Sequence, residues 1–341
     1  MQSSRFVILL EHSYNGEIMA VHLAEGVIAA AVQPFDTSGG IDWNTTARYI
    51  AQLAQAHPTA IAMNMAVSEV SSLEPAEQLD VMRRCKATLA GGCTLLSGLS
   101  VTNTRAAQDF SRRLVDAGAE GLVIFPPVPA FMGGVSIAMI EDYHGAVADS
   151  VDVPLIAFQN NVAAYPRGSI AALSKIPRLV AIKEASFNVD NTLANIEEAA
   201  AASRRIGVLT GSDTFILEAM LMGCDGALIG FAATATAALV EMHEHAAAGR
   251  ATEAYAIWHK LAPLARICWR APLRDYRVRM KYVLMKQGVL ANMHVRAPFP
   301  ALSSDDRRDI DAAFERLGLA DARFLPAGRA KAMTAAAVAA K

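Results

Sequence analysis

Short runs of apolar residues recur along most of the chain, and each is too short to be a helix. Turn residues bound them, and successive runs begin between 20 and 34 residues apart. A run of four to eight apolar residues bounded in this way is typical of a strand that is buried on both faces. Eight such runs are present, and they begin at Val27, Ala60, Thr94, Gly121, Pro154, Leu179, Ile206 and Gly226.

Segments with the polar and apolar periodicity of a helix lie between these runs, for example residues 104–117 and 137–148. Strands that alternate with amphipathic helices predict a parallel sheet with helical crossovers. Eight repeats favour an α/β fold of the closed (β/α)8 type, a TIM barrel, with a C-terminal helical extension. An open doubly wound sheet is the alternative, but its GxGxxG turn is missing: "VQPFDTSGG" follows the first strand instead.

The same pattern divides the chain into four parts. Residues 1–24 form an N-terminal extension, 25–234 the barrel, 235–325 a C-terminal helical region, and 326–341 an Ala-rich tail. The helical region includes "SSDDRRDIDAAFERLGL", in which serine and aspartate precede an apolar stripe as they do at a helix start.

Composition excludes several classes of function. With 341 residues and a net charge of −2, the chain has neither the basic surface of a nucleic-acid-binding protein nor a membrane-binding cluster. Its apolar segments are too short to span a membrane, so we expect a cytoplasmic protein.

Four cysteines without a CxxC pair predict free thiols, and His243-Glu244-His245 predicts helix surface. Neither pattern indicates a metal site.

One lysine stands out, because Lys183 ends the apolar run 179–182. At the carboxyl end of the sixth barrel strand its amine would reach the barrel mouth, where TIM barrels carry their chemistry. Apolar surroundings lower the pKa of a lysine and leave a neutral amine that can condense with a ketone. The alternative is a structural lysine that reaches solvent or pairs with Glu184 or Glu218.

Three longer stretches of sequence bear on this choice: "GVIAAAVQPFDTSGGIDW" at 26–43, "AIKEAS" at 181–186 and "LTGSDTFILEAMLMGCDGALIG" at 209–230. Together they resemble the dihydrodipicolinate synthase/N-acetylneuraminate lyase family of class I aldolases, over roughly residues 25 to 320. The resemblance implies a (β/α)8 barrel in which Lys183 forms a Schiff base with pyruvate or another 2-oxo acid. It also implies a homo-oligomer, tetramer or dimer, and no metal or organic cofactor.

The sequence departs from this family at its proton relay. Where most members have Thr-Thr-Gly-Glu, this chain has Ala66 to Glu69, although backbone amides at Ala66, Val67 and Ser68 could still bind a carboxylate. The family's strand-five tyrosine maps to Phe158, and a second tyrosine maps to about Val128. Neither replacement can carry a proton.

Other groups near the barrel mouth are therefore candidates for moving protons. They are Tyr165 on the rewritten loop, Ser68, Ser212, Asp213, a substrate carboxylate or a water. The alternative for Tyr165 is that it packs its ring, and for Asp213 that it caps a helix.

We expect Phe158 and Leu228 to form the apolar wall of the site, and Gly211 to let backbone approach it. "FPPVPAFMGG" at 125–134 predicts a stiff apolar loop over the pocket, or else a subunit interface.

Three hypotheses follow from these residues. In the first, the protein is a Schiff-base-forming lyase that acts through Lys183 on a 2-oxo acid. It would catalyse either aldol cleavage or condensation, or dehydration or deamination. In the second, it is a non-catalytic or slow 2-oxo-acid-binding barrel that retains the lysine. In the third, the lysine is structural and the function is unrelated.

Overall fold

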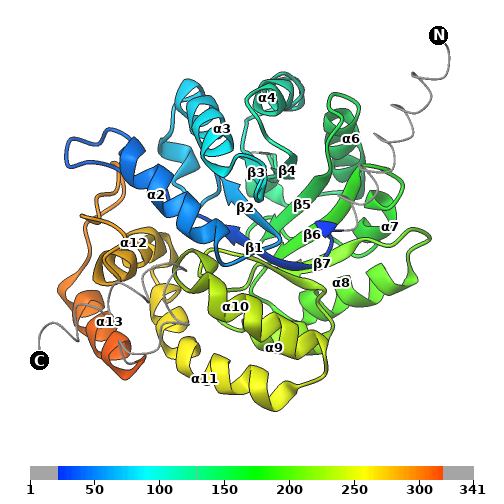
Figure 1. Ribbon diagram of the computed structural model, residues 1–341. Helices are drawn as coiled ribbons and strands as arrows, with labels where there is room; N and C mark the ends of the chain where they lie inside the picture. The colour runs from blue at the N-terminus through cyan, green and yellow to red at the C-terminus, as the bar shows by residue number, and fades with distance from the viewer. Residues whose placement is uncertain (1–21, 128, 318–341) are drawn as a thin grey trace, which may run out of the picture.

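The computed structural model describes residues 22–127 and 129–317, which include eight parallel strands closed into a barrel (Figure 1). Each strand begins within one residue of its predicted start, so the predicted barrel is confirmed and the open-sheet alternative is wrong. The strands are β1 (Gly26–Ala30), β2 (Ala60–Met63), β3 (Thr94–Leu99), β4 (Gly121–Ile124), β5 (Leu155–Asn160), β6 (Leu179–Ala185), β7 (Gly207–Thr210) and β8 (Gly226–Ile229).

The barrel closes where β1 pairs with β8, and two glycines face each other there. Gly26 is in register with Gly226, and a Cβ added at Gly226 would lie 2.0 Å from the Gly26 carbonyl oxygen. Real Cβ atoms do not approach backbone oxygen so closely. The absence of a side chain at this position is therefore a condition for closing the sheet.

Helices separate the strands and cover the outside of the barrel. The predicted helices at 104–117 and 137–148 appear as α4 and α6, and Asn103 and Ser136 cap them by accepting from the amides of Ala106 (2.9 Å) and Met139 (3.2 Å). The helices up to β8 are α2 (Trp43–Ala54), α3 (Pro75–Leu89), α4 (Thr104–Asp116), α5 (Ala130–Gly133), α6 (Ile137–Ala148), α7 (Ser169–Leu173), α8 (Val189–Ala201) and α9 (Ile216–Met222), with a 3₁₀ turn η1 (Val70–Ser72).

The C-terminal part of the chain is helical, as predicted. After α10 (Ala232–Ala247) come α11 (Ala251–Cys268), the 3₁₀ turn η2 (Leu273–Asp275), α12 (Tyr276–Lys286) and α13 (Ser304–Leu317). Because α10 packs against β1 and β8, it serves as the last barrel helix, and the predicted division at residue 235 falls inside it. The elements added to the barrel are therefore α11 to α13. The predicted tail at 326–341 and most of the N-terminal extension lie outside the described residues.

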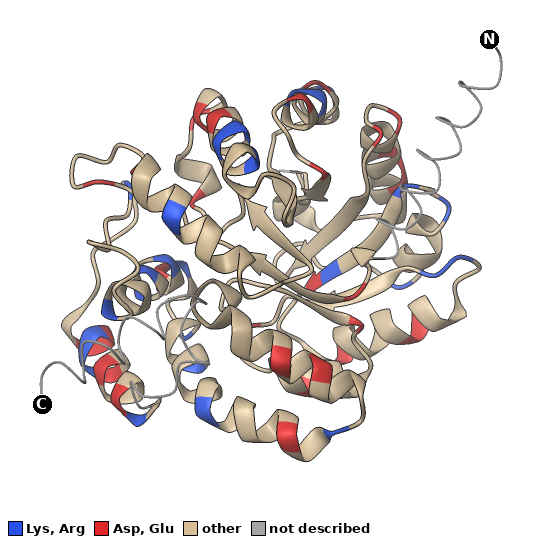
Figure 2. Cartoon of the chain, in the orientation of Figure 1, with Lys and Arg blue, Asp and Glu red and all other residues tan. Residues whose placement is uncertain are grey.

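Positions of acidic and basic residues are interspersed along the outer helices and loops (Figure 2). Within the described residues, the four cysteines are free, as predicted. None of the described helices is both long and apolar enough to cross a membrane.

A buried ion pair joins the C-terminal helices to the loop between β2 and η1. Lys281 on α12 pairs with Glu69 in that loop, and the exposed fraction of each side chain is 1% or less. The Lys281 ammonium also donates to the His294 carbonyl oxygen at 2.7 Å, and the Arg296 amide donates to Glu69 Oε2 at 3.0 Å. Nearby, Arg277 Nε donates to the Ala66 carbonyl oxygen at 2.8 Å. The loop after β2 is thus held from the C-terminal side.

Replacing Lys281 by Met would leave Glu69 buried without its counter-charge, so we predict a loss of about 3–5 kcal/mol in the free energy of unfolding. Lys286→Met on the same helix is the matched control. That lysine pairs with Asp311 at a partly exposed site, and its loss should cost about 1 kcal/mol or less. Equilibrium unfolding in urea measures both. Equal losses in the two variants would contradict the role given to the buried pair.

Candidate active site at the barrel mouth

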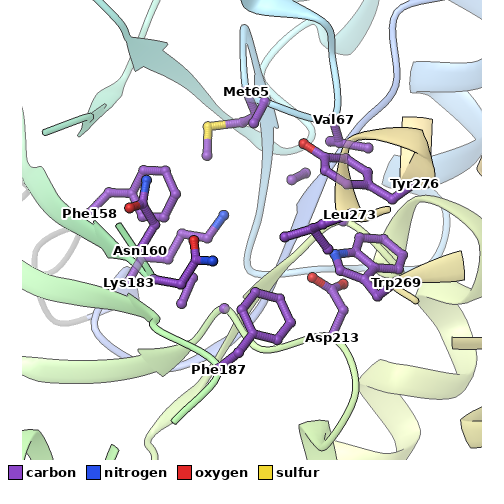
Figure 3. Close-up of a pocket in the computed structure, with 16 residues that line it drawn as sticks. Met65, Val67, Phe158, Asn160, Lys183, Phe187, Asp213, Trp269, Leu273 and Tyr276 are labelled. Carbon is purple, nitrogen blue, oxygen red and sulfur yellow. The ribbon is translucent and has the colours of Figure 1, made fainter. Parts of the chain in front are cut away.

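A cavity of about 160 Å³ opens at the carboxyl ends of the strands, where a TIM barrel carries its chemistry (Figure 3). Barrel strands, their following loops and the segment around η2 all contribute to its wall. The lining residues are Ala30, Met65, Ala66, Val67, Phe158, Asn160, Asn161, Lys183, Ala185, Phe187, Gly211, Asp213, Gly230, Trp269, Leu273 and Tyr276.

Lys183 extends from β6 into this cavity, and its side chain ends in the open space (Figure 3). Its Nζ lies 4.5 Å from the centre of the Phe158 ring, and it forms no ion pair within the described residues. Glu184, the next residue, points to the other face of the strand, where its carboxylate accepts from the Ser186 amide (2.9 Å) and the Thr192 hydroxyl (2.7 Å). Glu218 accepts from Trp258. The alternative in which Lys183 pairs with either glutamate is therefore wrong.

Burial shifts the pKa of both charged groups in the cavity. It lowers the pKa of Lys183 to about 8, although the Asp213 carboxylate opposes this by stabilising the ammonium form. Burial likewise raises the pKa of Asp213 to about 7, against the hydrogen bond that the Phe231 amide donates to its Oδ1 at 2.7 Å. A neutral amine at Lys183 is thus accessible close to neutral pH.

Gly211, at the end of β7, lies directly against the stem of Lys183. A Cβ at this position would lie 2.8 Å from Lys183 Cε and 2.6 Å from Ala185 Cβ. The lysine occupies the room that a side chain at residue 211 would need. Both Gly211 and Asp213, predicted from the sequence as substrate-binding residues, line the cavity.

The loop after β2 provides unused hydrogen-bond donors. Ala66 and Val67 line the cavity, and within the described residues neither of their amides has an acceptor. Ser68 differs: its amide donates to the Met65 carbonyl oxygen at 2.9 Å. Its hydroxyl donates to the Ala31 carbonyl oxygen at 2.6 Å and accepts from the Met65 amide. Two of the three predicted amides are therefore available to an anion, whereas Ser68 is used to shape the turn.

Three predicted site residues lie outside the lining of the cavity: Ser68, Tyr165 and Leu228. The Tyr165 hydroxyl is buried between His144 Nε2 (3.1 Å) and the Phe158 carbonyl oxygen (3.2 Å), behind the strand that carries Phe158. This placement matches the packing alternative for Tyr165 and gives it no contact with the cavity. Leu228 is fully buried on β8. Gly230, two residues later and therefore on the same side of the chain, lines the cavity instead.

None of the described residues of the loop predicted to cover the pocket, 125–127 and 129–134, lines it. Phe125 contacts Phe158 edge-to-face, with ring centres 4.8 Å apart, but Phe131 and Met132 are 47% and 90% exposed on the outside. Residue 128, the position aligned with the second family tyrosine, lies outside the described residues.

Sequence reasoning missed the part of the wall that comes from the C-terminal region. Trp269 stacks on Tyr276, with ring centres 5.2 Å apart and planes 8° apart, and both line the cavity with Leu273. Gly230 makes room for this cluster, because a Cβ there would lie 2.7 Å from Trp269 Cζ2. That glycine was a usable signal for a close approach, although it does not say which residue approaches.

Phe187, after β6, was also missed. Its φ is 55°, in the left-handed region that a bulky side chain rarely adopts. Such strain is typical of residues that are held in place at binding sites. Within the described residues, no three His, Cys, Asp or Glu side chains gather as they would around a metal ion.

The fold and the site together define a (β/α)8 barrel with a buried, unpaired lysine at the mouth of its sixth strand. A model of the Dihydrodipicolinate synthetase family matches residues 23–317, and the chain belongs to that family. The 4-hydroxy-tetrahydrodipicolinate synthases of Stutzerimonas stutzeri and Chlorobium phaeovibrioides are 26% and 27% identical to it, and each alignment covers 86% of this chain and 98% of the relative. An uncharacterized DapA-like lyase of Pyrobaculum arsenaticum is 24% identical over 86% of this chain and 99% of the relative.

Solved structures agree on the fold. A chloride-inhibited dihydrodipicolinate synthase from Acinetobacter baumannii, crystallised with pyruvate, has a TM-score of 0.78 at 23% identity. It is matched over 87% of this chain and 99% of its own. The dihydrodipicolinate synthase of Thermotoga maritima has a TM-score of 0.79 at 18% identity, over 86% of this chain and 99% of its own.

Replacing Asp213 by Asn removes the negative charge that stabilises the Lys183 ammonium, so the pKa of Lys183 should fall further below about 8. The midpoint of its reactivity would then move to lower pH. The rate at which acetic anhydride labels Lys183, followed by peptide mass against pH, measures that midpoint. Asp190→Asn, exposed on α8, is the control and should leave it in place. An unchanged or higher midpoint in the Asp213 variant would show that the two charges do not interact.

Proposed function

We propose that this protein is a Schiff-base-forming lyase that acts on a 2-oxo acid of the pyruvate type through Lys183. The observation that carries the proposal is the juxtaposition, in one small cavity, of an unpaired buried amine and two backbone amides without acceptors. An amine that can lose its proton attacks a ketone, and two free N–H groups suit the adjacent carboxylate. The names of the relatives and the pyruvate bound to one of the solved structures support the same chemistry.

Lys183 would condense with the substrate carbonyl, and the resulting protonated imine would withdraw electrons from the neighbouring carbon. That carbon could then be joined to, or cleaved from, the carbonyl carbon of an aldehyde, or its electron pair could expel a leaving group from the next carbon of the substrate. No metal or organic cofactor is needed for this step, because the imine is itself the electron acceptor. Phe158 and Gly211 would confine the lysine, and Asp213 would set its charge.

The remaining wall of the cavity suggests the character of the substrate beyond its 2-oxo acid group. Met65, Val67, Phe187, Trp269 and Leu273 are apolar or aromatic. Apart from Lys183 and Asp213, the described residues that line the cavity carry no formal charge. We therefore propose that the variable part of the substrate is uncharged.

A second candidate, a 2-oxo-acid-binding protein with little or no turnover, is favoured by one observation. Phe158 occupies the strand-five position where the family resemblance places a proton-carrying tyrosine. Its ring lies beside the Lys183 amine but has no group that can give or take a proton. Turnover with a panel of substituted 2-oxo acids, including aromatic ones, separates the two candidates.

Reduction with borohydride tests the step that both candidates share. Incubation with pyruvate and borohydride should add the mass of one reduced pyruvate to the peptide that contains Lys183. Lys183→Arg should abolish the adduct, whereas Lys175→Arg, an exposed lysine paired with Glu141, should not affect it. If neither pyruvate nor other 2-oxo acids give an adduct on Lys183, the structural interpretation of the lysine remains.

We further propose that the protein forms a homo-oligomer through the loops after β4 and β5, where Phe131, Met132 and Val162 are exposed to 47%, 90% and 57%. Met132→Asp should weaken the assembly and lower the sedimentation coefficient. Val189→Asp, an equally apolar but separate position on α8, should leave it unchanged. A wild-type protein that sediments as a monomer would rule out this surface as an interface.

A further inference from the structure

Among the described residues that line the cavity, one side chain carries a hydroxyl, and it comes from outside the barrel. Tyr276 is the first residue of α12, and its ring extends into the cavity from the wall opposite Lys183 (Figure 3). No hydrogen bond ties its hydroxyl to another of the described residues. The hydroxyl is therefore available to whatever occupies the cavity.

Several contacts fix the direction of this side chain. One face of the ring stacks on Trp269, and the Arg277 guanidinium lies 4.6 Å from the ring centre. Arg277 also donates to the Ala66 carbonyl oxygen at 2.8 Å, so the residue next to Tyr276 is tied to the loop after β2 that lines the cavity. A phenol held by stacking and by a tethered neighbour loses little conformational freedom when it donates a hydrogen bond.

Among the described residues that line the cavity, the barrel itself provides no hydroxyl, and its one carboxyl, on Asp213, accepts a hydrogen bond from the Phe231 amide at 2.7 Å. Phe158 has no hydroxyl, Ser68 Oγ bonds the Ala31 carbonyl oxygen, and Tyr165 lies behind β5. Imine chemistry nevertheless needs a group that gives and takes protons at the reacting carbon. Tyr276 presents its hydroxyl to the same cavity, from the wall opposite Lys183 (Figure 3).

We propose that Tyr276 is the catalytic acid and base of this site, a role that rests on the proposed Schiff-base function. When the neutral Lys183 amine attacks the substrate carbonyl, the new N–C bond forms and the oxygen takes the phenol proton. The phenolate then takes back a proton from the nitrogen.

The same hydroxyl next protonates the carbinolamine oxygen. The C–O bond breaks, water leaves, and the nitrogen keeps one proton in the iminium ion. The phenolate that remains removes a proton from the carbon beside the imine, which gives the enamine and restores the phenol. Burial raises the pKa of Tyr276 to about 12, so the resting enzyme holds the protonated form that this sequence starts from.

Exchange of the pyruvate methyl protons with D₂O, followed by ¹H NMR, tests this proposal without knowledge of the second substrate. Tyr276→Phe should lower the exchange rate at saturating pyruvate by about 10²–10⁴-fold. The pyruvate concentration that half-saturates borohydride trapping should change much less. Tyr255→Phe, a half-buried tyrosine on α11 away from the cavity, is the matched control and should exchange like the wild type.

The double variant Phe158→Tyr/Tyr276→Phe provides the rescue. It restores a hydroxyl beside Lys183 from the barrel side, and it should recover part of the lost exchange rate. The circular dichroism spectra of all variants should match that of the wild type.

The outcomes separate the two proposals. A wild type that forms no adduct with pyruvate overturns the Schiff-base function and this role together. A wild type that forms the adduct and exchanges protons, with Tyr276→Phe exchanging equally fast, overturns only the role of Tyr276. Weaker pyruvate binding in Tyr276→Phe with an unchanged exchange rate at saturation would mean that the ring merely packs, and would also overturn it.

Discussion

The site depends on the cost of keeping a charged ammonium away from water. Lys183 lies in a cavity whose walls are mostly apolar, with an aromatic ring 4.5 Å from its nitrogen and no ion pair within the described residues. Desolvation lowers the pKa of the amine to about 8, and Asp213 limits the shift. An ion pair in contact with the amine would fix the charge and remove the nucleophile, whereas an open, polar mouth would leave the pKa of Lys183 near its usual value.

The rest of the mouth is arranged by elements that are distant in sequence. The loop after β2 presents its amides, and α12 holds that loop through the Lys281–Glu69 ion pair and the Arg277 hydrogen bond to Ala66. The same helix contributes Tyr276, and Gly230 on β8 gives Trp269 room to approach. The added helices α11 to α13 are thus continuous with the site, so stability of the C-terminal region and geometry of the cavity are coupled.

The sequence was sufficient to predict the strands and the position of Lys183. The strands follow from local patterns, and the position of Lys183 follows because the carboxyl ends of all eight strands of a TIM barrel meet at the same end of the barrel. It could not place Tyr165, since a loop tyrosine can turn to either side of its strand, and burial with His144 decided this one. Leu228 is on the same side of the chain as the cavity-lining Gly230, but it lies deeper in the barrel than predicted and does not line the cavity. Trp269 and Tyr276 reach the cavity through packing across the whole chain, which no local pattern records.

The most direct test of this account is a crystal structure of the protein soaked with pyruvate. Continuous electron density should join Lys183 Nζ to the second carbon of pyruvate, and the carboxylate should accept hydrogen bonds from the Ala66 and Val67 amides. Density for pyruvate elsewhere, or an empty cavity with Lys183 turned away from it at saturating pyruvate, would contradict the claim that this desolvated amine is the reactive group.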